Sequence, residues 1–219
     1  MIVAHPDDET IWGGMHLASE NYRVVCLTYD QFHPRGKEFH EVMEATGSEW
    51  QMLGWPDLTD GKEDKWKDNR KVRMGQLESI IREKDWKKIV THNPEGEYGH
   101  PHHILTSRMV TSIVKTLRAE DRLFYFGPYY DAGDQRLNRL PRMQQDDLLA
   151  KKRLCLHYAS QNISMTAFSH MCPYEFFVPY CRWKHYGKSF LEKCQLVIRQ
   201  WQIKARFRFA VSRMLRRFV

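Results

Sequence analysis

Ala4-His5-Pro6-Asp7-Asp8-Glu9 joins an apolar run at residues 1–3 to a helical pattern over residues 10–21, as expected where a strand leads into a helix. An imidazole and two carboxylates therefore lie where a strand leads into a helix. Open α/β sheets place their chemistry outside the carboxyl ends of their strands. A second polar stretch, Tyr98-Gly99-His100-Pro101-His102-His103, occupies the same kind of turn about ninety residues later. Together the two stretches predict a metal site with a proton-transfer group beside it.

Short apolar runs alternate with amphipathic runs through the first 126 residues. This alternation predicts a Rossmann-like, doubly wound α/β fold, in which a mostly parallel sheet carries helices on both faces. We expect the polar residues 57–70 to form a surface excursion rather than a regular element. The expected strands lie at residues 1–4, 23–28, 50–53, 87–91, 122–126 and within 174–180, and the expected helices at 9–20, 36–47, 71–84, 101–118 and 142–158.

The size and composition suit one globular domain, which we place at residues 1–190. The chain has 219 residues, of which 42% are hydrophobic, enough for a sizeable core. No apolar run approaches the roughly 18 to 20 residues that a membrane span needs. We expect no signal peptide, because the first motif begins at residue 4. The five cysteines are odd in number and form no C-x-x-C pair, which favours a reducing, cytoplasmic location.

The net charge of +7 is concentrated near the end of the sequence. Residues 194–219 contain seven basic residues and no acidic ones, which leaves 27 of each sign in residues 1–193. We therefore expect no nucleic-acid partner for the body of the protein. Residues 191–219 predict a basic amphipathic helix at the C-terminal end. Two roles stay open for it: residues 194–219 contact an anionic membrane surface, or the helix packs on the body with its arginines in water.

The first polar stretch offers two metal ligands, because His5 and Asp8 are three residues apart and can converge from a turn that enters a helix. A catalytic zinc ion takes three protein ligands of this kind and keeps one position for water. His103 is the best third ligand, and Asp7 can act as a general base that faces the water. Taken separately, the first stretch also suits a capped helix start, and the histidines of the second suit an exposed loop. Their common place at strand ends favours the metal site.

These motifs resemble the PIG-L/LmbE family of zinc-dependent N-acetylglucosamine de-N-acetylases. The resemblance rests on residues 4–10 followed by Gly13-Gly14, and on residues 98–103. Weaker similarities follow in family order and extend the match to about residue 180. They are Arg35-x-x-Glu38, Leu53-Gly54-Trp55-Pro56-Asp57, and Tyr158-Ala159-Ser160-Gln161 after Lys151 and Lys152.

The resemblance implies a role for each motif residue. The implied zinc ligands are His5, Asp8 and His103, with Asp7 as general base. Fe²⁺ is compatible with the same ligands, so zinc rests on the resemblance and on common usage. His100 would polarise the acetamide carbonyl, stabilise the oxyanion and help to protonate the leaving amine, and Tyr98 would assist near the same oxygen. Arg35 and Asp57 would contact sugar hydroxyls, although a surface charge and a turn former explain them equally well.

The chain departs from the family pattern at three places. His102 stands where the family usually has aspartate, which leaves open that His102 replaces His103 as a ligand. The first strand is short, and Tyr29-Asp30-Gln31 lacks the usual glycine.

The predicted function is a metal-dependent hydrolase that removes the N-acetyl group from an N-acetylglucosamine-type sugar, with release of acetate. The sugar would belong to a glycolipid, a glycan or another sugar conjugate. Two alternatives stay open: hydrolysis of a different amide, and a non-catalytic sugar-binding or membrane-associated module that retains the fold.

Overall fold

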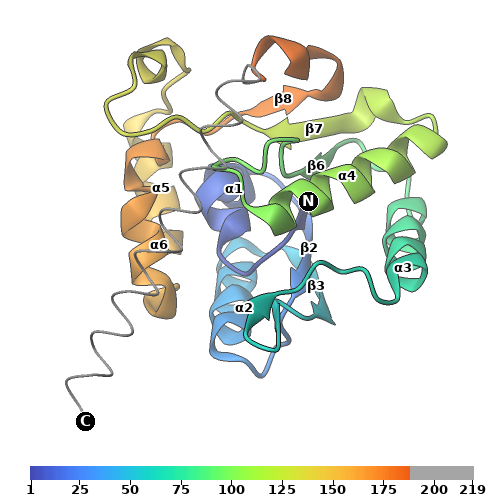
Figure 1. Cartoon of the computed structure of the whole chain (residues 1–219). Coiled ribbons are helices and arrows are strands. Elements are labelled where there is room, and N and C mark those ends of the chain that lie inside the picture. The colour runs from blue at the N-terminus through green and yellow to red at the C-terminus, as the bar shows by residue number, and fades with distance from the viewer. Residues whose placement is uncertain (188–219) are drawn as a thin grey trace.

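A computed structural model describes residues 1–187 of the chain (Figure 1). Its main sheet has the strand order β3-β2-β1-β6-β7-β8, in which only β8 runs antiparallel to its neighbour. The strands are β1 (Ile2–Val3), β2 (Arg23–Thr28), β3 (Glu49–Trp55), β6 (Ile89–Thr91), β7 (Leu123–Phe126) and β8 (Phe177–Pro179). The Rossmann-like, mostly parallel sheet predicted from the sequence is therefore confirmed.

Helices cover both faces of this sheet (Figure 1). They are α1 (Asp8–Ser19), α2 (Pro34–Thr46), α3 (Arg70–Arg82), α4 (Pro101–Thr116), α5 (Gln145–Cys155) and α6 (Asn162–Ala167). Short 3₁₀ helices cover Glu120–Arg122, Gln135–Arg139, Ala159–Gln161, Ser169–Met171 and Tyr180–His185.

The sheet separates two hydrophobic cores. Neighbouring residues of a strand belong to different cores, because their side chains point to opposite faces of the sheet. Val3 of β1 belongs to the core beneath α1, α2 and α5. Its neighbour Ile2 belongs to the core beneath α3 and α4. The two cores hold the sheet between its helix layers. Because β1 and β6 are parallel neighbours, their carboxyl ends lie at the same edge of the sheet.

The segment after β3 differs from the expected surface excursion. It contains a hairpin of β4 (Leu58–Thr59) and β5 (Lys62–Glu63), and it buries the indole of Trp66, which is 2% exposed. The indole Nε1 donates a hydrogen bond to the Pro56 carbonyl at 2.9 Å. One large buried aromatic side chain therefore ties a mainly charged segment to the body of the protein.

A buried ion pair ties α1 to α5 and to the segment before β8. The Lys151 ammonium, 1% exposed, lies 2.7 Å from Glu175 Oε2 and donates to the Ile11 carbonyl at 2.7 Å. The same carboxylate accepts the backbone N–H groups of Met15 and His16. Burial opposes ionisation of Glu175, but Lys151 and His16 outweigh it and lower the pKa of this carboxyl to about 2.

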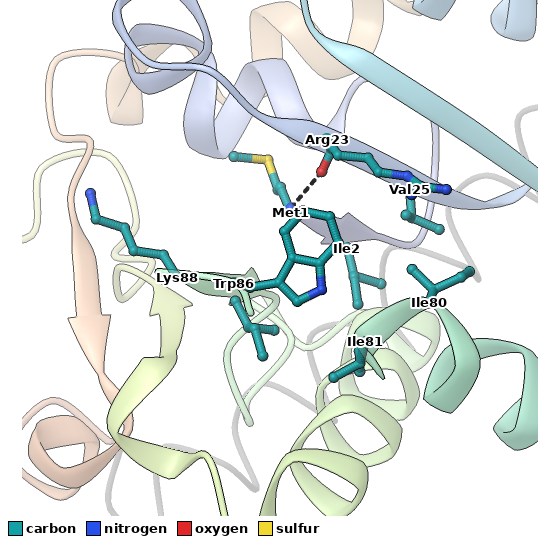
Figure 2. Close-up of a pocket in the computed structure, with 9 residues that line it drawn as sticks. Met1, Ile2, Arg23, Val25, Ile80, Ile81, Trp86 and Lys88 are labelled. Atoms are coloured by element: carbon teal, nitrogen blue, oxygen red, sulfur yellow. Dashed lines mark hydrogen bonds between the residues drawn. The ribbon is translucent and has the colours of Figure 1, made fainter. Parts of the chain in front are cut away.

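A small apolar pocket lies at the amino-terminal ends of β1, β2 and β6 (Figure 2). Trp86 and the isoleucines of α3 line it, and the backbone nitrogen of Met1 donates to the Arg23 carbonyl at 2.7 Å beside it. Its volume is about 30 Å³. Since both polar stretches follow the carboxyl ends of β1 and β6, this pocket lies at the end of the sheet opposite to them.

Within residues 1–187, no helix combines the length and the apolar character that crossing a bilayer requires. The basic helix predicted for residues 191–219, with its membrane-contacting residues 194–219, lies outside the described residues. Both that helix and its membrane contact stay predictions.

Candidate metal centre and pocket

The turn after β1 holds Asp7 in an unusual backbone conformation, with φ of 107° and ψ of −30°. Positive φ is uncommon for a residue with a side chain. The fully buried Glu9 supports this turn: its carboxylate accepts the Asp7 N–H at 3.1 Å and the Tyr158 hydroxyl at 2.5 Å. Asp7 occupies the N-cap position of α1, yet its side chain makes no capping hydrogen bond. A simple helix cap therefore does not account for this residue.

The three expected ligands converge at this edge of the sheet. His5 Nδ1 lies 3.2 Å from one oxygen of Asp8, Oδ2, and His103 Nε2 lies 3.2 Å from the other, Oδ1. All three side chains are buried. In the described part of the chain His103 Nε2 has no hydrogen-bond partner, although it is buried. Two imidazole nitrogens around a buried carboxylate suit a divalent cation such as Zn²⁺, so the residues present fit the metal that the sequence implies.

Two residues that the sequence analysis missed orient His103. Glu97 Oε2 accepts a hydrogen bond from His103 Nδ1 at 2.6 Å and another from His92 Nδ1 at 2.9 Å. His92 Nε2 in turn accepts the Ala4 N–H at 3.0 Å, so this nitrogen already has a partner. Burial opposes ionisation of Glu97, but the two histidines lower the pKa of its carboxyl to about 2. A carboxylate on Nδ1 leaves the Nε2 lone pair of His103 facing Asp8, the usual arrangement behind a metal-bound histidine.

Sequence signals for these two residues existed. His92 is the first residue after β6, and Glu97 comes directly before Tyr98 of the second polar stretch. Both therefore occupy the strand end where polar chemistry is expected.

Asp7 faces the same centre and pairs with Arg35. The guanidinium lies 3.1 Å from Asp7 Oδ2 and donates to the Pro6 carbonyl at 2.7 Å. It also donates to the Tyr29 hydroxyl, which donates to Asp57 Oδ2 at 2.6 Å. Burial raises the pKa of Asp7 to about 8, although Arg35 opposes the shift. A carboxyl group whose pKa lies near neutrality exchanges protons readily.

His100 begins α4 and has a defined ring orientation. Its Nδ1 accepts the His102 N–H at 3.2 Å, which caps the helix. The neutral ring therefore carries its proton on Nε2. Burial and the neighbouring His103 and His5 lower the pKa of His100 well below its usual value. Tyr98 lies beside it, with ring centroids 5.8 Å apart.

His102 lies on the far side of His5 from Asp8. Its Nδ1 is 3.0 Å from His5 Nε2, and its Nε2 is 2.6 Å from the Asp64 carbonyl oxygen. The structure thus places His103, and not His102, against Asp8. Nitrogen atoms of His5, His100 and His102 nonetheless lie within 4.8 Å of one another, so they form a second group of ligand type.

A pocket of about 140 Å³ opens over these groups. Part of its wall comes from the segment around α6, which the sequence analysis did not assign to the site. The lining residues are His5, Asp7, Asp8, Ile11, Arg35, Asp57, Tyr98, His100, Gln161, Ser164 and Phe168. The structure therefore gathers the predicted catalytic, ligand and sugar-binding side chains around one cavity, apart from His103, which lies behind it.

The chain is similar to several known proteins. A family model described as PIG-L, GlcNAc-PI de-N-acetylase, matches residues 1–114. An uncharacterised protein of Acanthamoeba polyphaga mimivirus is 32% identical over 130 residues, which cover 52% of this chain and 56% of that protein. A 1D-myo-inositol 2-acetamido-2-deoxy-α-D-glucopyranoside deacetylase of Streptomyces avermitilis is 26% identical over 195 residues, which cover 71% of this chain and 66% of that protein.

Two further similarities concern a yeast protein and a solved structure. A probable N-acetylglucosaminyl-phosphatidylinositol de-N-acetylase of Schizosaccharomyces pombe is 26% identical over 129 residues, which cover 52% of this chain and 50% of that protein. The chain thus spans about half to two thirds of the length of these curated relatives. The crystal structure of a 4-carboxy-2-hydroxymuconate hydratase from Pseudomonas putida matches with a TM-score of 0.55 and 15% identity, covering 78% of this chain and 82% of that one. At this identity the match concerns the fold alone.

Proposed function

This chain belongs to the PIG-L family, and we propose that it is a metal-dependent hydrolase that removes the acetyl group from an N-acetylglucosamine-type sugar. The observation that carries the proposal is the convergence of His5, Asp8 and His103 beside Asp7. The names of two relatives support the substrate class, because both are deacetylases of acetylated amino sugars.

His5, Asp8 and His103 would hold the cation, with Zn²⁺ as the expected ion and Fe²⁺ as the alternative. A divalent cation bound there supplies a Lewis acid, which polarises a carbonyl oxygen and makes water more acidic. Glu97 orients His103 by accepting a hydrogen bond from its Nδ1, and the Asp8 carboxylate accepts the backbone N–H of His5. These contacts orient the ligands without a bound ion.

Asp7 and His100 carry out the proton transfer and stabilise the developing charge, with Tyr98 beside them. Asp7 takes a proton from the attacking water, because its carboxylate faces the pocket beside the ligands. His100 donates its Nε2–H to the amide oxygen as negative charge develops there, since its Nδ1 is already an acceptor in the helix cap. The leaving amine needs a proton, and Asp7 holds the one that it removed from water. Tyr98 stands beside His100 on the wall of the same pocket.

Contact of Arg35 and Asp57 with sugar hydroxyls stays a prediction. Both line the pocket, but Arg35 already binds Asp7 and the Pro6 carbonyl, and Asp57 accepts from Tyr29. A sugar hydroxyl would therefore be an additional hydrogen-bond partner of Arg35 and Asp57. Gln161 and Ser164 extend the polar wall on the side of α6.

Acetate release from a panel of N-acetylglucosaminyl compounds tests the proposed function. We expect release from at least one sugar acetamide, its loss after dialysis against a chelator, and its return when Zn²⁺ is added. The panel includes N-acetylated amines without a sugar as the matched control. Turnover that is unaffected by chelation, or that is confined to the non-sugar amides, would contradict the proposed function.

A further inference from the structure

We propose that Tyr158 is a positioning residue for Asp7: through Glu9, it holds the turn that directs the Asp7 carboxylate into the pocket. The inference rests on the proposed function, in which Asp7 is the general base. Tyr158 is fully buried, is not among the residues that line the pocket, and lies 149 residues from Glu9 in sequence. It therefore acts on the reaction through another group.

The backbone of Asp7 is strained, and both of its polar groups are held. Residues with a side chain rarely adopt a φ of 107°, and such conformations persist only where the surrounding structure enforces them. The Asp7 carbonyl accepts the N–H groups of Thr10 and Ile11 at 3.1 and 2.8 Å. The Asp7 N–H donates to Glu9 Oε2 at 3.1 Å. The direction of the Asp7 side chain therefore depends on where the Glu9 carboxyl group lies.

Tyr158 is one of two partners that fix this carboxyl group. Glu9 Oε1 accepts the hydroxyl groups of Thr10 at 2.7 Å and of Tyr158 at 2.5 Å. Glu9 and Tyr158 are both 0% exposed, so water does not replace a partner that is lost. The Tyr158 backbone is itself held, because its N–H donates to the Cys155 carbonyl at 3.2 Å and its carbonyl accepts the Gln161 N–H at 3.0 Å. Without the Tyr158 hydroxyl, the Glu9 carboxyl group is free to shift, and the Asp7 N–H shifts with it.

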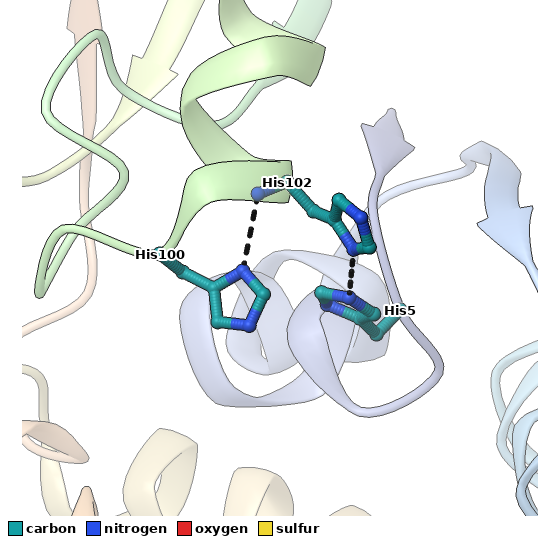
Figure 3. A group of neighbouring side chains, drawn as sticks. All are labelled: His5, His100 and His102. Atoms are coloured by element: carbon teal, nitrogen blue, oxygen red, sulfur yellow. Dashed lines mark hydrogen bonds between the residues drawn. The ribbon is translucent and has the colours of Figure 1, made fainter. Parts of the chain in front are cut away.

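The two metal ligands on either side of Asp7 are held independently of Tyr158. His5 Nε2 lies 3.0 Å from His102 Nδ1, a contact that Figure 3 shows. The Asp8 carboxylate accepts the His5 N–H at 2.8 Å. Loss of the Tyr158 hydroxyl should therefore displace Asp7 without dismantling the metal site.

Tyr158 also precedes the segment that forms the α6 side of the pocket, so action through Asp7 has to be separated from support of this wall. Gln161, Ser164 and Phe168 of the segment line the pocket. A displaced wall weakens substrate binding and raises the Michaelis constant, whereas a displaced base lowers the turnover number. The two kinetic constants therefore report on the two roles separately.

Tyr158→Phe removes the hydroxyl group and keeps the buried ring. Tyr125→Phe is the matched control, because Tyr125 is 2% exposed and its hydroxyl lies 2.7 Å from Thr111 Oγ1, in the hydrophobic core on the other face of the sheet. Both substitutions are made in the full chain, with and without Asp7→Asn. We measure the turnover number and the Michaelis constant for acetate release, the Zn²⁺ content per chain, and the Asp7 amide resonance by ¹⁵N NMR.

Tyr158→Phe is expected to lower the turnover number by about 10–100-fold, since misplacing a reacting group by about 1 Å costs up to about 10²-fold. The Michaelis constant and the Zn²⁺ content should stay at the wild-type level, and the Asp7 amide resonance should shift. Combined with Asp7→Asn, the same substitution should cause no further loss, because the group through which it acts is already gone. Tyr125→Phe should match the wild type in all four measurements.

Wild-type turnover in Tyr158→Phe would overturn the inference and leave the proposed function standing. The same holds for an equal further loss in combination with Asp7→Asn, for a raised Michaelis constant at unchanged turnover, and for loss of Zn²⁺, each of which assigns Tyr158 a structural role. A wild-type chain that releases no acetate removes the proposed function instead. The Asp7 amide resonance then still decides whether Tyr158 holds this turn, and an unshifted resonance in Tyr158→Phe would show that it does not.

Discussion

Asp7→Asn is expected to lower the turnover number by about 10²–10⁴-fold, the usual contribution of a positioned general base. The amide has the shape of the carboxylate but cannot take a proton from water. Asp7 faces the pocket beside the ligands but lies outside the group of His5, Asp8 and His103. The variant should therefore bind its cation as well as the wild type does.

The backbone at this position supports the same expectation. Asparagine tolerates positive φ at least as well as aspartate, so the strained turn should persist. Arg35 keeps its hydrogen bonds to the Pro6 carbonyl and to Tyr29 after the charge at residue 7 is lost. The measurement is steady-state acetate release together with metal content.

Asp60→Asn provides the matched control. Asp60 also has positive φ, at 53°, but it is exposed at the tip of the β4–β5 hairpin. Turnover at the wild-type level in both variants would assign the base to another residue.

His100→Ala is expected to lower the turnover number by about 10²–10³-fold, the cost of removing one donor to a developing oxyanion. The Michaelis constant should change little, because the hydrogen bond strengthens only as charge develops. The prediction follows from the cap: Nδ1 of His100 accepts the His102 N–H, so Nε2–H is left as a donor on the pocket side.

His33→Ala separates the loss of a helix cap from the loss of a catalytic donor. His33 precedes Pro34 and caps α2 by accepting the Arg35 N–H, as His100 precedes Pro101 and caps α4. It is exposed and is not among the residues that line the pocket. Both variants should lose similar stability, about 1 kcal/mol, but only His100→Ala should lose turnover. Equal turnover of the two variants would show that His100 takes no part in the reaction.

The sequence predicted the fold well where apolar periodicity is strong. The strands β2 and β7 are visible as short, continuous apolar runs, and α4 is visible because its apolar residues recur at helical spacing. The hairpin after β3 was not visible. Charged residues dominate that segment, and the one side chain that anchors it, Trp66, has no apolar partner nearby in sequence.

The candidate site was predictable only in part, for a similar reason. His5, Asp8 and His103 belong to dense polar clusters, whereas His92 and Glu97 are single polar residues whose contact with His103 depends on the fold. Likewise, Gln161 and Ser164 line the pocket through the placement of the segment around α6, which no local sequence pattern indicates. The contact between the His102 ring and the Asp64 carbonyl joins residues that are 38 apart in sequence.

Metal content per chain shows whether His5, Asp8 and His103 together bind one divalent cation. Purified wild-type chain and Asp8→Ala are equilibrated with Zn²⁺, dialysed and assayed by mass spectrometry of the elements, with circular dichroism to confirm folding. We expect one ion per folded wild-type chain and none in Asp8→Ala. A folded wild-type chain that retains no ion, or an Asp8→Ala variant that retains as much as wild type, would rule out this metal site.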